Sequence, residues 1–387
     1  DLFAGCGGLS LGLEQAGFIP VYVNELNKDA MDSYLSNRLE DNPLLEKYKS
    51  FDIKEFSENT NIEKLIKEIS KDYEIKDSVF PIDLVVGGPP CQGFSGMGHR
   101  RSYQVHKNKI PPNFLYKDMA AIINKISPKM FLFENVKGIL SAKWNDQGKK
   151  GEIWKDVLKT FILETGDYVV KNITIYSKDY GVPQNRPRVF IIGIHRSLSP
   201  KLDYNLLAHG LFPEPKQESP PHLFDLLSDL VDENYKMNFS TNKYPYNPMN
   251  ETQKIYRKDK NNNDLTKVSD HEYSKHKPHI EKKFNYMIKH QIDHTAGQNK
   301  LPEEFRTKKF RQKLLPKFWD VKGPTITITS LPDDFVHFAQ PRALTVREWA
   351  RIQTFPDWYQ FKGPRTTGGI RRSGDPTKNN FDRELPK

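Results

Sequence analysis

The first half of the chain alternates short apolar runs with longer amphipathic stretches. The runs are rich in β-branched and aromatic residues: Val21–Val23, Ile82–Val86, Met130–Phe133, Ile173–Tyr176 and Val189–Ile194. Such runs are typical of parallel strands buried on both faces. Helical periodicity marks the stretches Leu9–Ala16, Lys28–Asn37, Ile62–Lys71, Leu115–Ile126 and Ile153–Thr165. This alternation predicts an α/β fold with an open, mostly parallel, doubly wound sheet.

The pattern changes after Arg196. The chain to about Lys322 is polar and weakly periodic, which predicts a second, smaller and irregular domain. Within it, Lys258–Asp264 has the composition of an exposed loop, and Val268–His290 carries scattered helical signals. Further on, the β-branched segment Pro324–Ser330 predicts a strand.

The segment Leu344–Thr354 predicts an amphipathic helix near the end of the chain. Thr345 stands at a suitable N-cap position, and Glu348 follows three residues later, so the two match a capping box. Pro356 follows the predicted helix end.

Composition narrows the class of protein only slightly. The chain has 387 residues and a formal net charge of +10, which favours a polyanionic partner but also fits an ordinary basic protein. Its two cysteines, Cys6 and Cys91, form no disulfide framework or zinc motif and fit a reducing, intracellular setting. No apolar run of about eighteen residues predicts a membrane span. No signal peptide is visible, although the sequence opens at Asp1 without a methionine.

A glycine-rich turn opens the chain, in the segment DLFAGCGGLSLGLEQAGF. Glycines allow a ligand to approach the backbone, and the helix that follows offers unpaired N–H groups. Ser10 stands where the dinucleotide fingerprint requires its third glycine, so a nucleoside cofactor fits better than a pyrophosphate. Glu25, after the next strand, could accept hydrogen bonds from ribose hydroxyls. A tight turn without a ligand is the alternative.

A second turn presents Cys91 after a buried strand, in DLVVGGPPCQGFS. The carboxyl edge of an open α/β sheet is where ligands bind, so Cys91 is a candidate nucleophile. The alternative is a small buried hydrophobe. The basic run that follows, to Lys109, suggests a positively charged loop that closes over a polyanion. A solvated surface loop is the alternative for that run.

Two further motifs bring charged residues to the same edge. Glu134 follows a buried strand in FLFENVKG and is a candidate acid catalyst beside a cysteine. In YGVPQNRPRVF, the alternating spacing of Gln184, Arg186 and Arg188 places them on one face of an extended strand. A guanidinium suits carbonyl and phosphate oxygens. A cap or an ion-pair member is the alternative for Glu134, and a structural ion pair is the alternative for Arg186.

Taken together and in order, these motifs and RALTVREWARIQTFPD resemble the cytosine carbon-5 DNA methyltransferase family. The resemblance covers residues 1–196 and 324–361 and implies a Rossmann-like, S-adenosylmethionine-dependent methyltransferase fold. It implies that Cys91 attacks carbon 6 of a flipped-out cytosine, while Glu134 contacts ring nitrogen 3. Arg188 would contact the cytosine carbonyl, with Arg186 nearby. The catalytic set is therefore Cys91, Glu134, Arg186 and Arg188.

The resemblance also assigns the binding residues. The cofactor S-adenosylmethionine, converted to S-adenosylhomocysteine, would contact Phe3, Gly5, Cys6, Gly7, Gly8, Leu9, Glu25, Leu26, Asp52, Ile53 and Pro90. Duplex DNA would contact Gln92, Ser95, Arg100, Arg101, Thr327 and Thr329. No metal is expected.

The family pattern further implies a catalytic domain of residues 1–198, completed by 340–387, and a target-recognition domain of residues 199–339. The family begins its first strand before DLFAG and ends with a segment that this sequence lacks, so we expect a piece of a longer protein. We also expect a monomer in the bacterial cytoplasm that is paired with a restriction endonuclease.

Three alternatives compete with this interpretation. A transfer RNA methyltransferase shares the fold, but the PCQGFS form and the long recognition region favour DNA. A DNA-binding relative that has lost catalysis is disfavoured by the intact Cys91, Glu134, Arg186 and Arg188. A nicotinamide-dependent oxidoreductase is disfavoured by the broken glycine fingerprint.

Overall fold

The computed structural model describes residues 1–76, 79–90, 114–145, 147–201, 212, 214–215, 219–235, 241–292, 299–306, 312–320, 323–326 and 335–364. The chain divides into two compact units. The first comprises residues 1–176 and 187–215, and the second comprises residues 177–186 and 216–387. In this division residues 340–364 fall in the second unit, whereas the family pattern assigns them to the catalytic domain. Those domain bounds stay a prediction.

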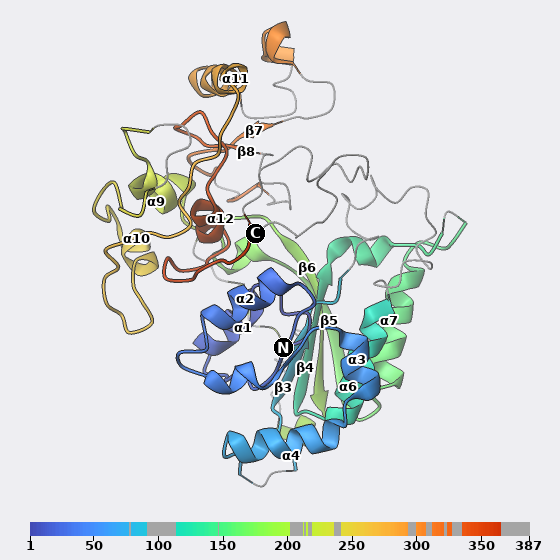
Figure 1. Ribbon diagram of the computed structural model, residues 1–387. Coiled ribbons are helices and arrows are strands. Elements are labelled where there is room, and N and C mark those ends of the chain that lie inside the picture. The colour runs from blue at the N-terminus through green and yellow to red at the C-terminus, as the bar shows by residue number, and fades with distance from the viewer. Residues whose placement is uncertain are drawn as a thin grey trace, which may run out of the picture. The chain divides into compact units, whose positions relative to one another are not determined.

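The first unit alternates strands and helices as the apolar pattern predicts (Figure 1). Its helices are α1 (Gly8–Gln15), α2 (Lys28–Ser36), α3 (Ile53–Asn59), α4 (Ile62–Asp72), α6 (Leu115–Ile126) and α7 (Glu152–Leu163). Its strands are β1 (Val23–Asn24), β2 (Lys49–Ser50), β3 (Leu84–Gly87), β4 (Met130–Val136), β5 (Tyr168–Tyr176) and β6 (Pro187–His195). Short 3-10 turns are η1 (Pro43–Glu46), η4 (Lys137–Ser141) and η6 (Arg196–Lys201). Of these described helices and strands, β2 and α3 were not anticipated.

The strands form one mixed sheet. β1 and β2 are parallel, β3 and β4 are parallel, and Leu2 bridges in parallel to both Asn24 and Gly87. β6 is antiparallel to both of its neighbours, β4 and β5. The fold is therefore α/β with a mostly parallel sheet, as predicted, but β6 runs antiparallel to the other strands. A loop of residues 177–186 is too short for the crossover helix that a parallel β5–β6 pair would need.

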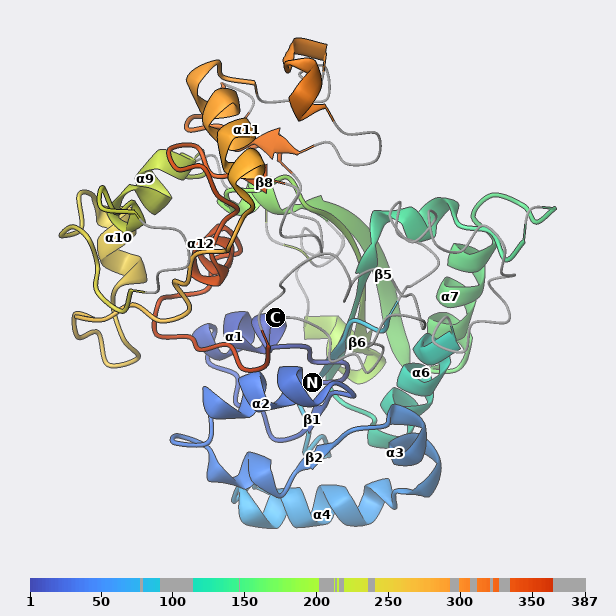
Figure 2. The same cartoon turned by 45° about the horizontal axis from the view of Figure 1, so that its top comes forward.

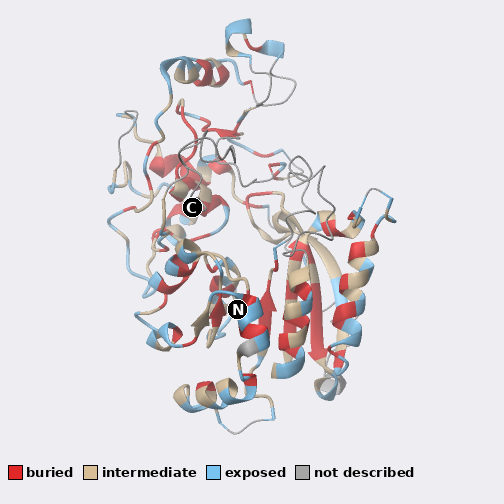
Figure 3. Cartoon of the chain, turned by 45° about the vertical axis from the view of Figure 1, so that its right-hand side comes forward, coloured by how far each residue is buried: buried red, intermediate tan, exposed pale blue. Residues whose placement is uncertain are grey.

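Aromatic packing fills the core between the sheet and the helices on one flank, α3, α6 and α7 (Figure 2). The rings of Phe131 and Phe133 in β4 lie 5.5 and 5.0 Å from that of Phe161 in α7. Gly193 in β6 lies opposite Phe131 in β4. A Cβ atom at Gly193 would lie 2.0 Å from the Phe131 ring, so only glycine fits there. Figure 3 shows buried residues on the inward faces of these helices and along the strands, where half-buried positions lie between them.

The second unit contains little regular structure, as predicted. Its elements are η5 (Ser177–Tyr180), α9 (Leu223–Leu227), η7 (Ser228–Leu230), α10 (Glu251–Tyr256), α11 (Pro278–Lys289), η9 (Glu303–Phe305), β7 (Lys313–Leu314), β8 (Phe335–Val336) and α12 (Val346–Ile352). The strands β7 and β8 form a separate parallel pair. α12 confirms the predicted helix, and its capping box is formed: Thr345 accepts from the Glu348 amide, and Glu348 accepts from the Thr345 amide.

The strand predicted at Pro324–Ser330 is wrong for those of its residues that the structure describes. Residues 324–326 lie in no strand, and the rest of Pro324–Ser330 falls outside the described residues. Ile326 is instead buried in an apolar cluster, and its carbonyl accepts one hydrogen bond from the Asn185 amide at 2.6 Å. A β-branched segment becomes a strand only where a partner strand is available.

Candidate active site

The glycine-rich turn lies at the carboxyl edge of the sheet, between Leu2 and α1. Phe3, Gly5 and Gly7 all have positive φ, of 57°, 56° and 87°. Gly7 is the N-cap of α1, and its carbonyl accepts from the Leu11 amide at 2.9 Å. Positive φ is a strained conformation for a residue with a side chain, so Phe3 is held there by its surroundings.

Glu25 links this turn to the end of β1. Its Oε2 accepts a hydrogen bond from the Gly5 amide at 2.8 Å, and its Oε1 accepts one from the Asn27 amide at 2.8 Å. Each carboxylate oxygen has two lone pairs, so Glu25 retains capacity for further donors. The neighbouring Leu26 side chain is 72% exposed and offers an apolar surface beside the carboxylate.

Asn24 fixes the next loop and was not singled out from the sequence. Its buried amide donates to Ser50 Oγ at 2.9 Å and to the Phe51 carbonyl at 3.0 Å. This loop leads directly into α3, where Asp52 is the exposed N-cap and accepts from the Lys54 amide at 2.8 Å. Ile53 follows with its side chain packed in the core, where it anchors α3.

Cys6 lies in the same turn, but it is a poor nucleophile. Burial raises the pKa of its thiol, and the nearby Arg38 guanidinium only partly opposes this effect. The thiol therefore stays protonated at neutral pH, whereas the thiolate is the reactive form.

Two closely packed glycines lie at the end of β3, with Gly87 against Leu2 and Gly88 against Glu134 in β4. A Cβ at Gly87 would lie 2.9 Å from the Leu2 carbonyl oxygen, and a Cβ at Gly88 would lie 3.0 Å from Glu134 Oε2. The buried Asn135 amide donates to the Pro89 carbonyl at 3.2 Å. The contacts of Gly88 and Pro89 hold the segment before Cys91 against the end of β4. Pro90, the last described residue before Cys91, is exposed.

Glu134 and Arg188 form an ion pair at this edge. Glu134 in β4 lies opposite Phe190 in β6, and Arg188 is diagonal to it on the same face. Arg188 Nε lies 2.5 Å from Glu134 Oε1, and the two side chains are only 16% and 28% exposed. The structure thus brings together two of the predicted catalytic residues. The other carboxylate oxygen, Oε2, is the one next to Gly88.

A largely apolar cavity of about 470 Å³ lies elsewhere in the first unit. Its walls include Tyr22, Ile82 and Leu84, at the amino ends of β1 and β3. It includes neither Glu25 nor Glu134. Ligands of open α/β sheets bind at the carboxyl ends of the strands, so this cavity is not the candidate active site.

Comparison with known proteins gives the family. A family model described as C-5 cytosine-specific DNA methylase matches residues 1–375. The type II methyltransferase M.DdeI of Desulfomicrobium norvegicum is 32% identical over 377 residues, which are 95% of this chain and 80% of the relative. The chain belongs to the C-5 cytosine-specific DNA methylase family.

Further similarities agree with this assignment of the methylase. M.FnuDI of Fusobacterium nucleatum, another type II methyltransferase, is 28% identical, with 97% of this chain and 89% of the relative covered. A crystal structure of an E. coli prophage-encoded protein matches 94% of this chain and 89% of its own, with a TM-score of 0.63 and 26% identity.

The methylase is therefore an enzyme that methylates carbon 5 of cytosine in DNA. The family implies S-adenosylmethionine as the methyl donor. Since the family acts on DNA, the transfer RNA and nicotinamide alternatives are set aside. The roles of individual residues stay predictions.

Several predicted site residues of the methylase lie outside the described residues: Cys91, Gln92, Ser95, Arg100, Arg101, Thr327 and Thr329. Gly8 and Leu9, also predicted to contact the cofactor, form the first turn of α1. Arg186 lies one residue before β6 and is half-buried.

Sequence reasoning missed Asn24 and Asn135, which position the predicted residues through their side-chain amides. Each ends or follows a buried apolar run, and a polar residue there is a signal that could have been used. No described helix is long and apolar enough to cross a membrane. Within the described part of the chain, no group of three or more His, Cys, Asp or Glu side chains could hold a metal ion.

Proposed function

We propose that this enzyme methylates a cytosine flipped out of duplex DNA, through a covalent adduct with Cys91, as the modification partner of a restriction endonuclease. The observation that carries the chemistry is the Glu134–Arg188 ion pair beside Gly88. This pair sets a carboxylate of β4 and a guanidinium of β6 beside Gly88, in the segment that leads from β3 toward Cys91. The type II names of the relatives support the biological role.

In this proposal Glu134 and Arg188 polarise the pyrimidine ring. Glu134 Oε1 is occupied by Arg188, so Oε2 is the oxygen available to ring nitrogen 3 and the exocyclic amine. Arg188, with Arg186 nearby, would donate to the cytosine carbonyl oxygen. Hydrogen bonds placed where charge develops are the largest catalytic effect in many enzymes.

Cys91 would attack carbon 6 as a thiolate, because unactivated cytosine carbon 5 is too weak a nucleophile. The electron pair of the 5,6 double bond shifts toward carbon 5 while Glu134 supports the charge at nitrogen 3. Carbon 5 then gains the methyl group. Loss of the carbon-5 proton to a base re-forms the double bond and releases the Cys91 thiolate, so the enzyme is regenerated.

The residues around the glycine-rich turn fit S-adenosylmethionine, which would supply an electrophilic methyl group. A ligand could approach Gly5, since nothing lies within 4 Å of a Cβ built there. Glu25 has lone pairs free for ribose hydroxyls, and Leu26 and Phe51 are 72% and 44% exposed beside it. We propose that Phe3 stacks on the adenine, that Asp52 and Ile53 meet its edge, and that Cys6, Gly7, Gly8, Leu9 and Pro90 line the rest.

DNA recognition is assigned to residues 199–339 and to the segment that follows Cys91. Polar side chains in residues 199–339 would read bases in the major groove while lysines and arginines contact phosphates. Gln92, Ser95, Arg100 and Arg101 would approach the flipped cytosine from the loop, and Thr327 and Thr329 from the recognition region. We propose that the enzyme acts as a monomer and uses no metal.

The test is methyl transfer from tritiated S-adenosylmethionine to unmethylated duplex DNA. We expect label in 5-methylcytosine with the unaltered enzyme and none with Cys91→Ser. Glu134→Gln should slow transfer by about 100-fold or more, as expected for loss of an acid catalyst. Glu164→Gln, at the exposed end of α7, is the matched control and should keep the full rate.

DNA containing 5-fluorocytosine tests the adduct itself, because the fluorine cannot leave as a proton does. A covalent complex that survives denaturation should form with the unaltered enzyme and not with Cys91→Ser. Undiminished methylation by Cys91→Ser, or label in RNA alone, would contradict the proposal.

A further inference from the structure

The connection between β5 and β6 carries Arg186 at its last position. It runs from Ser177 to Arg186 and begins with the turn η5. Tyr176 pairs with Pro187 as the final pair of the antiparallel ladder, so Ser177 and Arg186 lie opposite each other just beyond it. The Ser177 amide donates to the Arg186 carbonyl at 3.2 Å and closes the loop.

The hydroxyl of Ser177 makes two further bonds across this loop. Its Oγ donates to the Gln184 carbonyl at 2.7 Å and accepts from the Arg186 amide at 3.0 Å. A hydroxyl has one donor and two lone pairs, so it can make both bonds at once. The Ser177 carbonyl accepts from the Val182 amide at 3.2 Å, which folds the middle of the loop back on the same residue.

Both backbone polar groups of Arg186 are thus bound by a single residue, Ser177. The residue after Arg186 is Pro187, which has no N–H group with which to extend the ladder. Without the hydroxyl, the Gln184 carbonyl and the Arg186 amide would lose these hydrogen bonds beside the buried Gln184 side chain. The Ser177 hydroxyl therefore helps to fix the backbone conformation of Arg186 just before β6.

We propose that Ser177 is a positioning residue for methyl transfer: its hydroxyl sets the Arg186 backbone so that the guanidinium reaches the flipped cytosine. This inference rests on the proposed function, in which Arg186 and Arg188 act on the cytosine carbonyl. Small displacements of a positioned group can slow an enzyme about 100-fold. Here the effect is expected in the rate of transfer rather than in cofactor binding, because no described Ser177 contact involves the glycine-rich turn.

The experiment measures single-turnover methyl transfer to unmethylated duplex DNA by the full chain. We expect Ser177→Ala to slow the transfer about 10-fold or more, at an unchanged Kd for S-adenosylmethionine. Ser177→Thr keeps the hydroxyl and should recover most of the rate. Ser141→Ala, at the exposed end of η4, is the matched serine control and should keep the full rate.

A double-mutant cycle separates positioning from a general structural role. Arg186→Ala should be slow, and adding Ser177→Ala to it should cause no further loss, because the group being positioned is already absent. Thermal unfolding of each variant shows whether the chain is folded at the assay temperature. A Ser177→Ala enzyme with the full rate, a Ser177→Thr enzyme that is folded but not rescued, or an equal loss in both backgrounds would overturn the inference.

The outcome for Arg186→Ala alone separates this inference from the proposed function. If Arg186→Ala is slow while Ser177→Ala is fast, Arg186 keeps its proposed role and only the positioning by Ser177 fails. If Arg186→Ala is as fast as the unaltered enzyme, the role of Arg186 in the proposed function fails, and the positioning role fails with it.

Discussion

The two units of this methylase are stabilised by different kinds of core. In the first unit the most deeply buried side chains are apolar, with Phe131, Phe133 and Phe161 fully buried between sheet and helix. In the second unit the largest fully buried side chains include Arg342, Arg347 and Arg351. The first core is stabilised mainly by burial of apolar surface, which requires no particular direction of contact. The second core contains buried charges, each of which needs a partner of opposite charge in a defined position.

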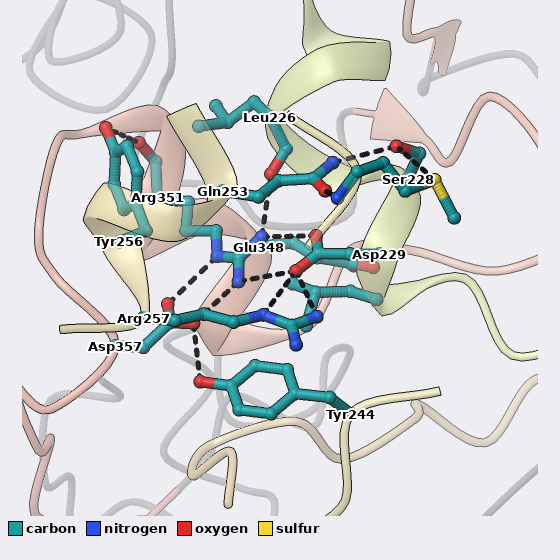
Figure 4. A network of polar contacts seen from close by, with 12 residues as sticks. Leu226, Ser228, Asp229, Tyr244, Gln253, Tyr256, Arg257, Glu348, Arg351 and Asp357 are labelled. Atoms are coloured by element: carbon teal, nitrogen blue, oxygen red, sulfur yellow. Dashed lines mark hydrogen bonds and ion pairs between the residues drawn. The ribbon is translucent and has the colours of Figure 1, made fainter. Parts of the chain in front are cut away.

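Figure 4 shows the network of hydrogen bonds and ion pairs around Arg351 in the core of the second unit. This guanidinium in α12 lies 2.6 Å from Asp229 in η7 and 2.6 Å from Asp357. Asp229 also binds Arg257 after α10 at 2.5 Å, and Tyr244 donates to Asp357 at 2.7 Å. One network therefore joins segments far apart in sequence in a unit with few strands or helices.

A second buried pair joins Arg342 to Glu348. Two bonds of 2.7 and 2.6 Å connect them, and Glu348 also closes the capping box of α12. Burial is the largest single effect and would by itself raise the pKa of Glu348, but the charge and the hydrogen bonds of Arg342, together with His337 and His271, lower the pKa below its usual value. We therefore expect the apolar sheet core to tolerate a volume-conserving substitution better than the buried ionic core tolerates loss of one partner.

The largest expected effect follows from Arg351→Met. The change leaves Asp229 and Asp357 buried without their main cation and should lower the unfolding free energy by about 3–5 kcal/mol. Urea denaturation of the second unit, followed by tryptophan fluorescence, measures it. The exposed Arg196→Met should change stability by less than about 0.5 kcal/mol. Equal stability of the two variants would remove the contrast between the cores.

Per pH unit, a smaller effect is expected from acid, through two buried histidines of the second unit. Burial lowers the pKa of His271 to about 4 and that of His337 to about 3. His271 is held neutral between Thr345 Oγ1 at 3.0 Å and the Leu230 carbonyl at 3.1 Å.

The direction of this pH dependence follows from the number of protons bound by the folded and the unfolded chain. Below about pH 6.5 the unfolded chain protonates both histidines and the folded chain does not, so stability falls as the pH falls. Each histidine should contribute about 1.4 kcal/mol per pH unit, between pH 6 and about 4 for His271 and to about 3 for His337. Denaturation at pH 7, 6 and 5 measures the slope, and His271→Asn should reduce it. A slope that His271→Asn leaves unchanged would show that His271 is not buried in its neutral form.

The smallest effect is expected in the apolar core of the first unit. Phe133→Leu keeps an apolar side chain of similar volume and should lower the unfolding free energy by only about 1–1.5 kcal/mol. The same denaturation experiment, read by the loss of methyl transfer at low urea, compares it with Arg351→Met. A loss of unfolding free energy as large as that of Arg351→Met would mean that the apolar core is as sensitive to substitution as the ionic core.

Local patterns anticipated much of the first unit. The predicted bounds of α6 agree with the structure at both ends, and those of α2 and α4 agree within one residue, because a helix depends on nearby periodicity and caps. The strand β2 is only Lys49–Ser50 and has no apolar run, so nothing local could reveal it. In the candidate site, Glu134 and Arg188 were proposed because each lies near the end of a predicted strand. Their ion pair depends on the register between β4 and β6, which the sequence does not reveal.

By itself, then, the amino-acid sequence determined the alternation of strands and helices, the order of the motifs and the capping box of α12. Only the tertiary structure decided that β6 runs antiparallel, that Arg188 meets Glu134, and that Ser177 binds both backbone groups of Arg186. It also decided that the arginines of an amphipathic helix segment are buried rather than exposed. The physical reason is range: periodicity and caps act within a few residues, whereas pairing, register and charge burial join residues that only the folded chain brings together.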